Sequence, residues 1–151
     1  MIQTKRTNAE DQDLLLLIKQ LDKELAVTDG EEHSFYDQYN KLDRIKCFII
    51  LYENESPVGC GALKEFEPGV AEVKRMFVKP ESRGKGLASV VLKELEKWAA
   101  ELSFRKCILE TGIRQPDAIQ LYKKNGYSII PNYGQYAGVE NSVCFMKVLS
   151  E

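Results

Sequence analysis

The chain has 151 residues, a length that suits one compact domain with a sizeable core, and we expect residues 1–151 to form it. Its net charge is −2 and its basic residues are dispersed, which argues against a nucleic-acid partner. No apolar run approaches the roughly 20 residues that a membrane-spanning helix needs, and residues 1–10 lack the apolar core of a signal peptide. These features favour a cytoplasmic enzyme with neither a nucleic-acid nor a membrane partner.

The first half of the chain predicts strands that surround an early helical region. Polar and apolar residues alternate over Ile2–Arg6, which is typical of a short strand, and Asn8 is expected to cap a helix that runs to about Ala26. A second helix is predicted over His33–Lys41. The three strands predicted next are Cys47–Tyr52, Val58–Phe66 and Ala71–Val78, with a hairpin turn at 53–57 between the first two.

The second half alternates helices and strands. The clearest helix has an apolar stripe formed by Leu87, Val91, Leu95, Trp98 and Leu102. The elements predicted after it are a strand at Cys107–Thr111, a helix at Asp117–Asn125, and strands at Tyr127–Ile130 and Ser142–Val148. Helices between strands imply parallel pairing in the middle, and hairpins imply antiparallel pairing at the start. We therefore expect an α/β (α+β) fold, with a single mixed central sheet of about six to seven strands flanked by about four helices.

The four cysteines are far apart in sequence and form no Cys-x-x-Cys pair. The chain has one histidine, His33, so a zinc site is not expected, and neither is any other metal. We expect reduced, mostly buried thiols, because unpaired cysteine usually behaves as a small apolar residue. Cys144 is the thiol closest to the candidate acceptor tyrosines described below.

A glycine-rich turn joins a strand end at Met76–Val78 to the clearest helix. Its residues, Arg83-Gly84-Lys85-Gly86, place two glycines and two cations at a helix N-terminus. Glycine lets the backbone approach a ligand, and the helix end offers unpaired N–H groups, so the turn predicts a phosphate or pyrophosphate site. Neither the P-loop pattern nor the dinucleotide Gly-x-Gly-x-x-Gly pattern occurs in the chain.

The turn contains Arg83-x-x-Gly86-x-Ala88. Ala118-Ile119-Gln120-Leu121-Tyr122-x-x-x-Gly126-Tyr127 follows 30 residues later. The two motifs in this order resemble the GNAT superfamily of coenzyme-A-dependent N-acyltransferases, and the resemblance extends from about Gln3 to Val148. It implies a GNAT-like acyl-CoA N-acyltransferase fold, acetyl-CoA as cosubstrate without a metal, and a monomer or homodimer.

The resemblance also implies how the cosubstrate is held. The turn's backbone amides would bind the pyrophosphate, and the preceding strand end would pair with the pantetheine arm. The cofactor-binding residues implied are Met76, Phe77, Val78, Arg83, Gly84, Lys85, Gly86, Leu87, Ala88, Gln115, Ala118 and Tyr122. Family members often have asparagine where Gln115 stands. Tyr122 is implied to donate to the departing CoA thiolate, and core packing is the rival explanation.

Two carboxylates inside apolar strands are candidates for catalytic residues. Glu72 begins the strand that leads to the glycine turn, where some GNAT members carry a catalytic glutamate. The alternative for Glu72 is an exposed residue or an ion pair with Lys74 or Arg75. Glu110 lies in the apolar strand that starts at Cys107, and burial there would raise its pKa towards the range of a general base. There are three alternatives to Glu110 as the base. It could be a structural carboxylate, it could pair with the substrate ammonium, or the proton could leave through water.

Three tyrosines are candidates for the acceptor-binding site. The resemblance places the segments of Tyr36, Tyr133 and Tyr136 beside the acceptor cleft, and core packing is the alternative. The leading function is transfer of the acetyl group of acetyl-CoA to a primary amine of a small-molecule or amino-acid-like acceptor, by direct attack in a ternary complex. The alternatives are a non-catalytic acyl-CoA-binding or sensing module, and a protein lysine or N-terminal acetyltransferase.

Overall fold

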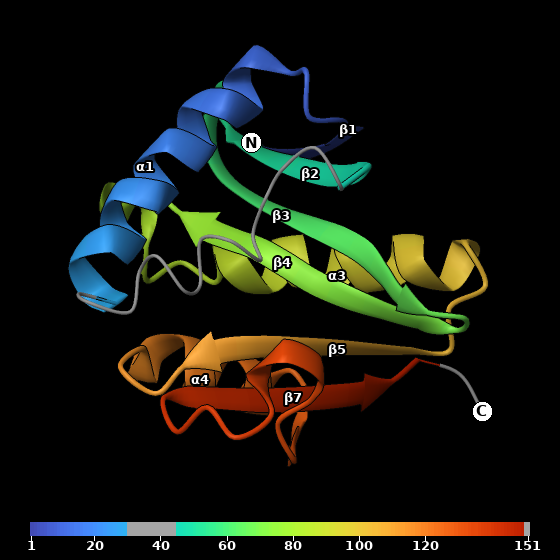
Figure 1. The fold of residues 1–151 in the computed structure, drawn as a ribbon. Helices are drawn as coiled ribbons and strands as arrows, with labels where there is room; N and C mark the ends of the chain where they lie inside the picture. Colours follow the sequence, from blue (N-terminus) through green and yellow to red (C-terminus); the bar gives the residue numbers. More distant parts are fainter. Residues whose placement is uncertain (30–44, 150–151) are drawn as a thin grey trace.

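A seven-stranded mixed sheet runs through the centre of the molecule, with the order β1-β2-β3-β4-β5-β7-β6 (Figure 1). The structure, a computed structural model, describes residues 1–29 and 45–149. The strands are β1 (Ile2–Thr7), β2 (Cys47–Glu53), β3 (Ser56–Glu67), β4 (Val70–Val78), β5 (Lys106–Gly112), β6 (Ser128–Ile130) and β7 (Ser142–Val148). The helices are α1 (Gln12–Asp29), α3 (Leu87–Glu101) and α4 (Pro116–Lys124), with 3-10 turns η3 (Pro80–Ser82) and η4 (Gly134–Tyr136).

The pairing directions follow from the connections between strands. In the first half of the sheet, each strand pairs antiparallel with the next one, β1 with β2, β2 with β3 and β3 with β4. Tight turns join β2 to β3 and β3 to β4. β4 and β5 are parallel because α3 carries the chain back across the sheet between them. β7 pairs antiparallel with both β5 and β6. The predicted mixed sheet, with antiparallel pairing at the start and parallel pairing in the middle, is confirmed.

Helices cover both faces of the sheet (Figure 1). α1 lies on one face, where Leu14, Leu17, Ile18 and Leu21 are buried against the sheet. α3 and α4 lie on the other face, and the α3 stripe packs there, with Val91 and Leu95 fully buried. No helix among residues 1–29 and 45–149 is both long and apolar enough to cross a bilayer.

β4 and β5 diverge after a short paired stretch. Only three residue pairs join them, the last being Glu72 with Ile108, although both strands continue further. Beyond this pair, the side of β4 that faces β5 has no strand partner in the described residues. The centre of the sheet therefore opens towards the end that carries the glycine turn.

A β-bulge in β4 lies just beyond the divergence. Cys60 pairs with Phe77 and Ala62 pairs with Lys74, so Gly61 alone faces two residues of β4. One of these two, Arg75, has a φ of 57°, which is uncommon for a residue other than glycine. A bulge shifts the alternation of side chains. Met76 consequently packs against the buried side chains of α3, whereas Lys74 contacts Tyr136 on the other face of the sheet.

Several boundaries differ from the sequence prediction. The 53–57 turn contains only Asn54 and Glu55, both at positive φ, because a two-residue turn of this shape fits the strand twist. Asp11, not Asn8, caps α1, since its carboxylate accepts the backbone N–H of residues 13 and 14. Asn8 accepts the N–H of Glu10 in the preceding turn.

The helix count is three in the described residues rather than about four. The fourth predicted helix, His33–Lys41, lies outside the described residues. α1 runs to Asp29, slightly beyond the predicted end at about Ala26.

Candidate functional site

The glycine turn ends in a helix whose N-terminus has no side-chain cap. Gly86 is the N-cap residue of α3 with φ 78°, and Gly84 has φ 83°. A Cβ atom added at either glycine would meet no atom within 4 Å, so open space lies in front of both. The first helical backbone bond runs from Val90 to the Gly86 carbonyl, which leaves the preceding N–H groups directed out of the helix end. This is the geometry that an anionic group binds.

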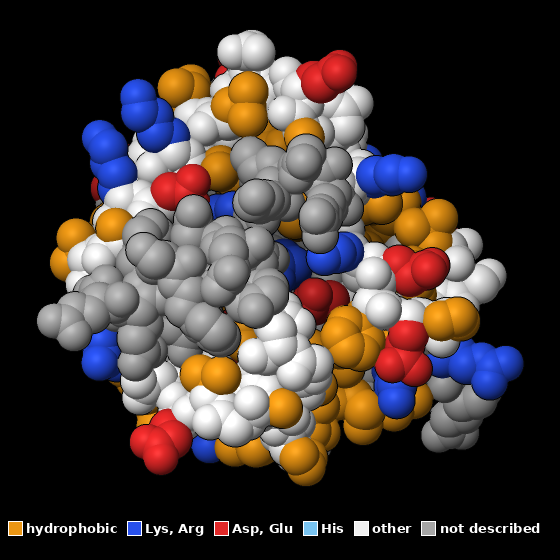
Figure 2. All heavy atoms as spheres, in the orientation of Figure 1, with side chains coloured by type: hydrophobic (Ala, Val, Ile, Leu, Met, Phe, Trp, Pro, Cys, Tyr) orange, Lys and Arg blue, Asp and Glu red, His pale blue; other side chains and the backbone are white. Residues whose placement is uncertain are grey.

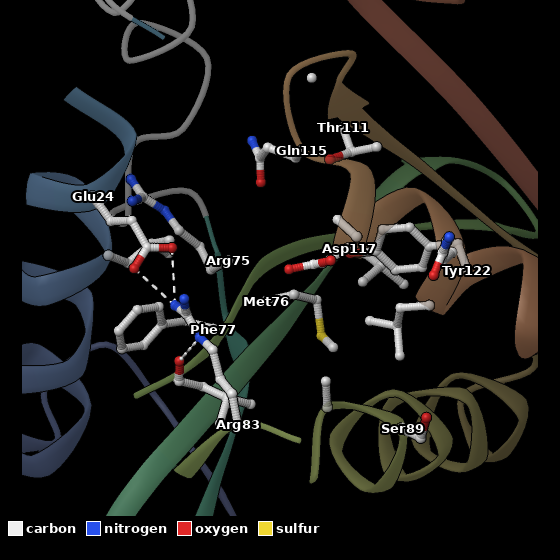
Figure 3. Close-up of a pocket in the computed structure, with 18 of the residues that line it drawn as sticks. Glu24, Arg75, Met76, Phe77, Arg83, Ser89, Thr111, Gln115, Asp117 and Tyr122 are labelled. Atoms are coloured by element: carbon white, nitrogen blue, oxygen red, sulfur yellow. Dashed lines mark hydrogen bonds and ion pairs between the residues drawn. The ribbon is translucent and has the colours of Figure 1, made fainter. Parts of the chain in front are cut away.

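The two cations of the turn contact carboxylates of other elements. The Arg83 guanidinium donates to both oxygens of Glu24 on α1, at 2.9 and 2.7 Å, and its Nε donates to the Val78 carbonyl at 2.8 Å (Figure 3). The Lys85 ammonium lies 3.2 Å from Glu53. Arg83 therefore connects the turn to α1 and to the end of β4. It also places a positive charge near the predicted phosphate site.

A cavity of about 790 Å³ connects the glycine turn with the divergence of β4 and β5. Most of the predicted site residues line it, from both motifs and from β4 and β5. They are Glu72, Met76, Phe77, Val78, Arg83, Gly84, Gly86, Leu87, Ala88, Glu110, Gln115, Ala118, Tyr122 and Tyr136. Lys85 and Tyr133 do not line the cavity, and Tyr36 lies outside the described residues.

Tyr122 lies on α4, across the cavity from Arg83 and Glu24 (Figure 3). Its ring packs between Tyr127 and Phe145, so part of the packing explanation is correct. Its hydroxyl has no hydrogen-bond partner in the part of the chain that the structure describes. Burial, reinforced by the negative charge of Glu110, raises the Tyr122 pKa far above its ordinary value, so the hydroxyl stays protonated at neutral pH.

Glu110 lies on β5 beyond the last β4–β5 pair. The Ser142 hydroxyl donates to its carboxylate at 2.6 Å. Glu110 lines the same cavity as Tyr122 and Tyr136, and its negative charge contributes to raising the pKa of both tyrosines. Glu110 is therefore near both the candidate donor and the candidate acceptor side of the cavity.

Glu72 belongs to a buried polar cluster with Lys74, Tyr133 and Tyr136. The Tyr133 hydroxyl donates to the Glu72 carboxylate at 2.6 Å, and the Lys74 ammonium lies 3.8 Å from the same oxygen. The ion pair between Glu72 and Lys74, which the sequence suggested as an alternative to a catalytic role, is therefore present. Lys74 also donates to the Tyr136 hydroxyl at 3.4 Å. Burial lowers the Lys74 pKa, and the charge of Glu72 opposes this shift.

Sequence reasoning missed Lys74 and Arg75 as residues that line the cavity. Both were considered only as ion-pair partners of Glu72, but the Arg75 guanidinium pairs with Asp22 on α1. Ser89 also lines the cavity, and its hydroxyl accepts a hydrogen bond from Asn125 at 3.0 Å. Strict alternation along β4 separates residues 74 and 75 onto opposite faces, and the bulge that changes this alternation has no local sequence signal that we recognised.

Burial raises the pKa of all four thiols, which makes them weak nucleophiles, and three of them are fully buried while Cys47 is half-buried. Cys144 is fully buried beside Tyr136, and burial raises its pKa to about 11. Burial also raises the pKa of both Cys60 and Cys107 to about 12. No group of three or more histidine, cysteine or carboxylate side chains in the described ranges could hold a metal ion.

The cavity fits the acyl-CoA that the sequence resemblance implies. Its volume lies within the range of about 300–1,000 Å³ typical of ligand pockets. The open glycine turn could hold the pyrophosphate, and the unpartnered side of β4 could pair with an extended arm, since main-chain groups bind an added strand in this way. The Val78 carbonyl already accepts from Arg83, so the pairing would involve the residues before it.

Comparisons with known proteins agree with this geometry. The model of the acetyltransferase (GNAT) family matches residues 15–127. An IAA acetyltransferase of Azospirillum brasilense is 33% identical over 122 residues, which cover 80% of each chain. An uncharacterised N-acetyltransferase of Schizosaccharomyces pombe is 34% identical over 82 residues, and the match covers 54% of this chain and half of that relative.

Solved structures share the fold over nearly the whole chain. A Klebsiella pneumoniae protein assigned to the acyl-CoA N-acyltransferases has a TM-score of 0.83 and 29% identity, with 99% and 98% of the two chains covered. The PaiA N-acetyltransferase of Thermoplasma acidophilum, solved with coenzyme A, has a TM-score of 0.73 and 20% identity, with 98% and 99% covered. The recognised motifs, the mixed sheet and the family model agree. The chain therefore belongs to the GNAT family of acetyltransferases.

Proposed function

We propose that the chain transfers the acetyl group of acetyl-CoA to a primary amine of a small-molecule or amino-acid-like acceptor, by direct attack in a ternary complex. The observation that carries this proposal is the single cavity that reaches from the glycine turn to Tyr122 and Glu110. Because both ends belong to one cavity, the acyl donor and the amine can be bound together. Direct transfer then needs no covalent enzyme intermediate, in keeping with the burial of Cys60, Cys107 and Cys144.

Tyr122 acts as a hydrogen-bond donor to the leaving group. Acetyl-CoA supplies an activated acetyl group and a thiol whose pKa is about 8.5. The pKa of Tyr122 is raised above its ordinary value, and therefore further from that of the thiol. The hydroxyl is thus suited to stabilise the developing negative charge on sulfur through a hydrogen bond, more than to give up its proton completely.

Glu110 receives the acceptor amine. It lies beyond the point where β4 and β5 separate, and it accepts a hydrogen bond from Ser142. An ionised carboxylate there can hold the incoming ammonium and take its proton directly or through water. Glu72 has a positioning role, because Tyr133 and Lys74 already contact its carboxylate.

A thiol-release assay across a panel of amines tests this function. The panel contains amino acids, polyamines, aminoglycosides and short peptides, and each reaction is compared with one that lacks the amine. We expect release of CoA thiol that depends on at least one small amine, with a mass increase of one acetyl group on that amine. Tight CoA binding without turnover, or turnover with peptides alone, would contradict the proposal.

A further inference from the structure

Two opposite charges face each other where β4 and β5 diverge. Glu72 and Ile108 form the last pair between the strands, and Lys74 and Glu110 each lie two residues further along their own strand. Side chains alternate with a period of two, so Lys74 lies on the same face of the sheet as Glu72, and Glu110 lies on the same face as Ile108. Since Glu72 and Ile108 are paired, all four side chains lie on one face. Both line the cavity. Basic and acidic side chains are both visible in a recess near the middle of this side of the molecule (Figure 2).

The Lys74 ammonium is buried but only loosely contacted. Its side chain is 5% exposed, and its polar neighbours are the Tyr136 hydroxyl at 3.4 Å and the Glu72 carboxylate at 3.8 Å. A well-formed bond between an ammonium and a carboxylate is about 2.7–2.9 Å long. The Glu72 oxygen nearest to Lys74 also accepts the closer Tyr133 hydroxyl. Among the described residues, Lys74 therefore retains donors that can bind a further acceptor.

Two other charged residues, Arg75 and Glu110, lie near Lys74 and have different neighbours. Arg75, the next residue on β4, forms an ion pair with Asp22 on α1. Glu110 lies on β5, the strand that leads into α4 and Tyr122, whereas Lys74 lies on β4 and contacts Tyr136. An acceptor amine at Glu110 would thus lie towards Tyr122, and any second polar group of the acceptor would lie towards Lys74.

We propose that Lys74 binds the carboxylate of an acceptor that carries an amine and a carboxylate close together, which makes an α-amino acid or a similarly short amino acid the substrate class. This inference rests on the proposed acetyl transfer. The negative charge of Glu110 and the positive charge of Lys74 are complementary to the two charges of such a zwitterion. An amine without a carboxylate would leave the buried ammonium with only its long contacts, which is unfavourable.

Matched acid and amide acceptors test this inference in the wild-type protein. Thiol release is measured for each L-amino acid and for its carboxamide, which keeps the amine and side chain but lacks the negative charge. We expect the best amino acid to exceed its amide in kcat/KM by about 10-fold or more, the scale of a hydrogen bond to a charged group. Equal use of acid and amide would overturn the assignment of Lys74 while leaving the proposed function intact.

Substitutions then connect the preference to one residue. Lys74→Met keeps the length and removes the charge, and it should lower kcat/KM for the amino acid about 10-fold or more, mainly through KM, with the amide changed little. Lys74→Arg should retain the preference for the acid. Lys93→Met, on the solvent side of α3, is the matched control, and CoA affinity should be unchanged in all three variants.

The remaining outcomes are also decisive. An equal loss of acid and amide turnover in Lys74→Met would mean that Lys74 has only a structural role. If Lys74→Met fails to fold, the wild-type ratio of acid to amide decides alone. No thiol release with any acid, amide or other amine would overturn the proposed function and this inference with it.

Discussion

The two ends of the cavity are built in different ways. The glycine-turn end is lined by α1, the end of β4, the turn and the start of α3, whereas the proposed acceptor end is lined by residues of β4, β5 and η4. Backbone N–H groups can hold a carrier common to many reactions whatever the side chains are. Charged side chains select among acceptors, and they depend on how distant segments pack. Under the proposed function, recognition of the acyl carrier and recognition of the acceptor should therefore be separable by substitution.

The ion pairs at the two ends show the same contrast. The Arg83 and Glu24 side chains are 44% and 41% exposed, whereas Lys74 and Glu72 are 5% and 4% exposed. Exposed pairs contribute little because water and salt screen them. A buried pair that loses one partner leaves an uncompensated charge, which is strongly unfavourable. Substitutions at the acceptor end should therefore have larger effects than charge changes at the glycine turn.

Tyr122→Phe should have the largest effect, because Tyr122 lies where the two ends meet. The change removes one hydroxyl group and keeps the ring that packs on Tyr127 and Phe145. We expect kcat to fall roughly 10²-fold or more, the scale of a lost donor to a developing anion, while folding and CoA affinity survive. The loss should be smaller with an acyl donor whose thiol leaves more easily. Steady-state kinetics that retain most of the wild-type kcat would assign Tyr122 to packing alone.

Glu110→Gln should affect the acceptor end selectively. It keeps the shape of the side chain and can still accept from Ser142, but it removes the charge that would hold an ammonium. We expect kcat/KM for the amine to fall by about 10-fold or more, in line with the loss of a charge-assisted bond or a general base. Calorimetry should give a nearly normal affinity for acetyl-CoA. Unchanged turnover and acceptor KM would remove Glu110 from the site.

Gly86→Val should affect the cofactor end selectively. Its side chain would extend into the open space in front of the turn, and valine at φ 78° is strained. CoA affinity should fall at least tenfold, which corresponds to ~1.4 kcal/mol. Gly69→Val is the matched control, since Gly69 has φ 83° and equally open space but lies in the β3–β4 turn, away from the cavity. If both variants bind CoA like the wild type, the turn does not hold the pyrophosphate.

Glu24→Gln should have the smallest effect. It removes the charged partner of Arg83 on α1, and the exposed pair should contribute less than ~1 kcal/mol to the free energy of unfolding. The Glu24 carboxylate would compete with the CoA phosphates for Arg83, so its removal should raise CoA affinity about two- to threefold over the wild type at low salt. At high salt, the variant and the wild type should have the same affinity. Titrations at two ionic strengths measure this. A large loss of CoA affinity would instead show that the bridge to α1 holds the turn in its binding conformation.

Much of the fold could be predicted because its signals are local. Each predicted strand in the described residues has a counterpart. The α3 stripe is buried as expected at Leu87, Val91 and Leu95, whereas Trp98 is half-buried and Leu102 is 49% exposed. The errors lie at boundaries, such as the cap of α1, where Asp11 accepts the first helical N–H groups and Asn8 accepts the N–H of Glu10. The helix predicted over His33–Lys41 and the acceptor assignment of Tyr36 stay predictions, since both fall outside the described residues.

The sequence by itself determined the order of elements, the glycine turn at a helix N-terminus and the motif tyrosine, because periodicity and turn chemistry depend on neighbouring residues. Only the tertiary structure decided the partners of the charged groups. Arg83 meets Glu24 from 59 positions away, and Tyr133 meets Glu72 from 61 positions away. The bulge at Arg75 and the early end of β4–β5 pairing then place Lys74 and Glu110 on one cavity. Such contacts follow from strand register and packing, which no local pattern along the chain specifies.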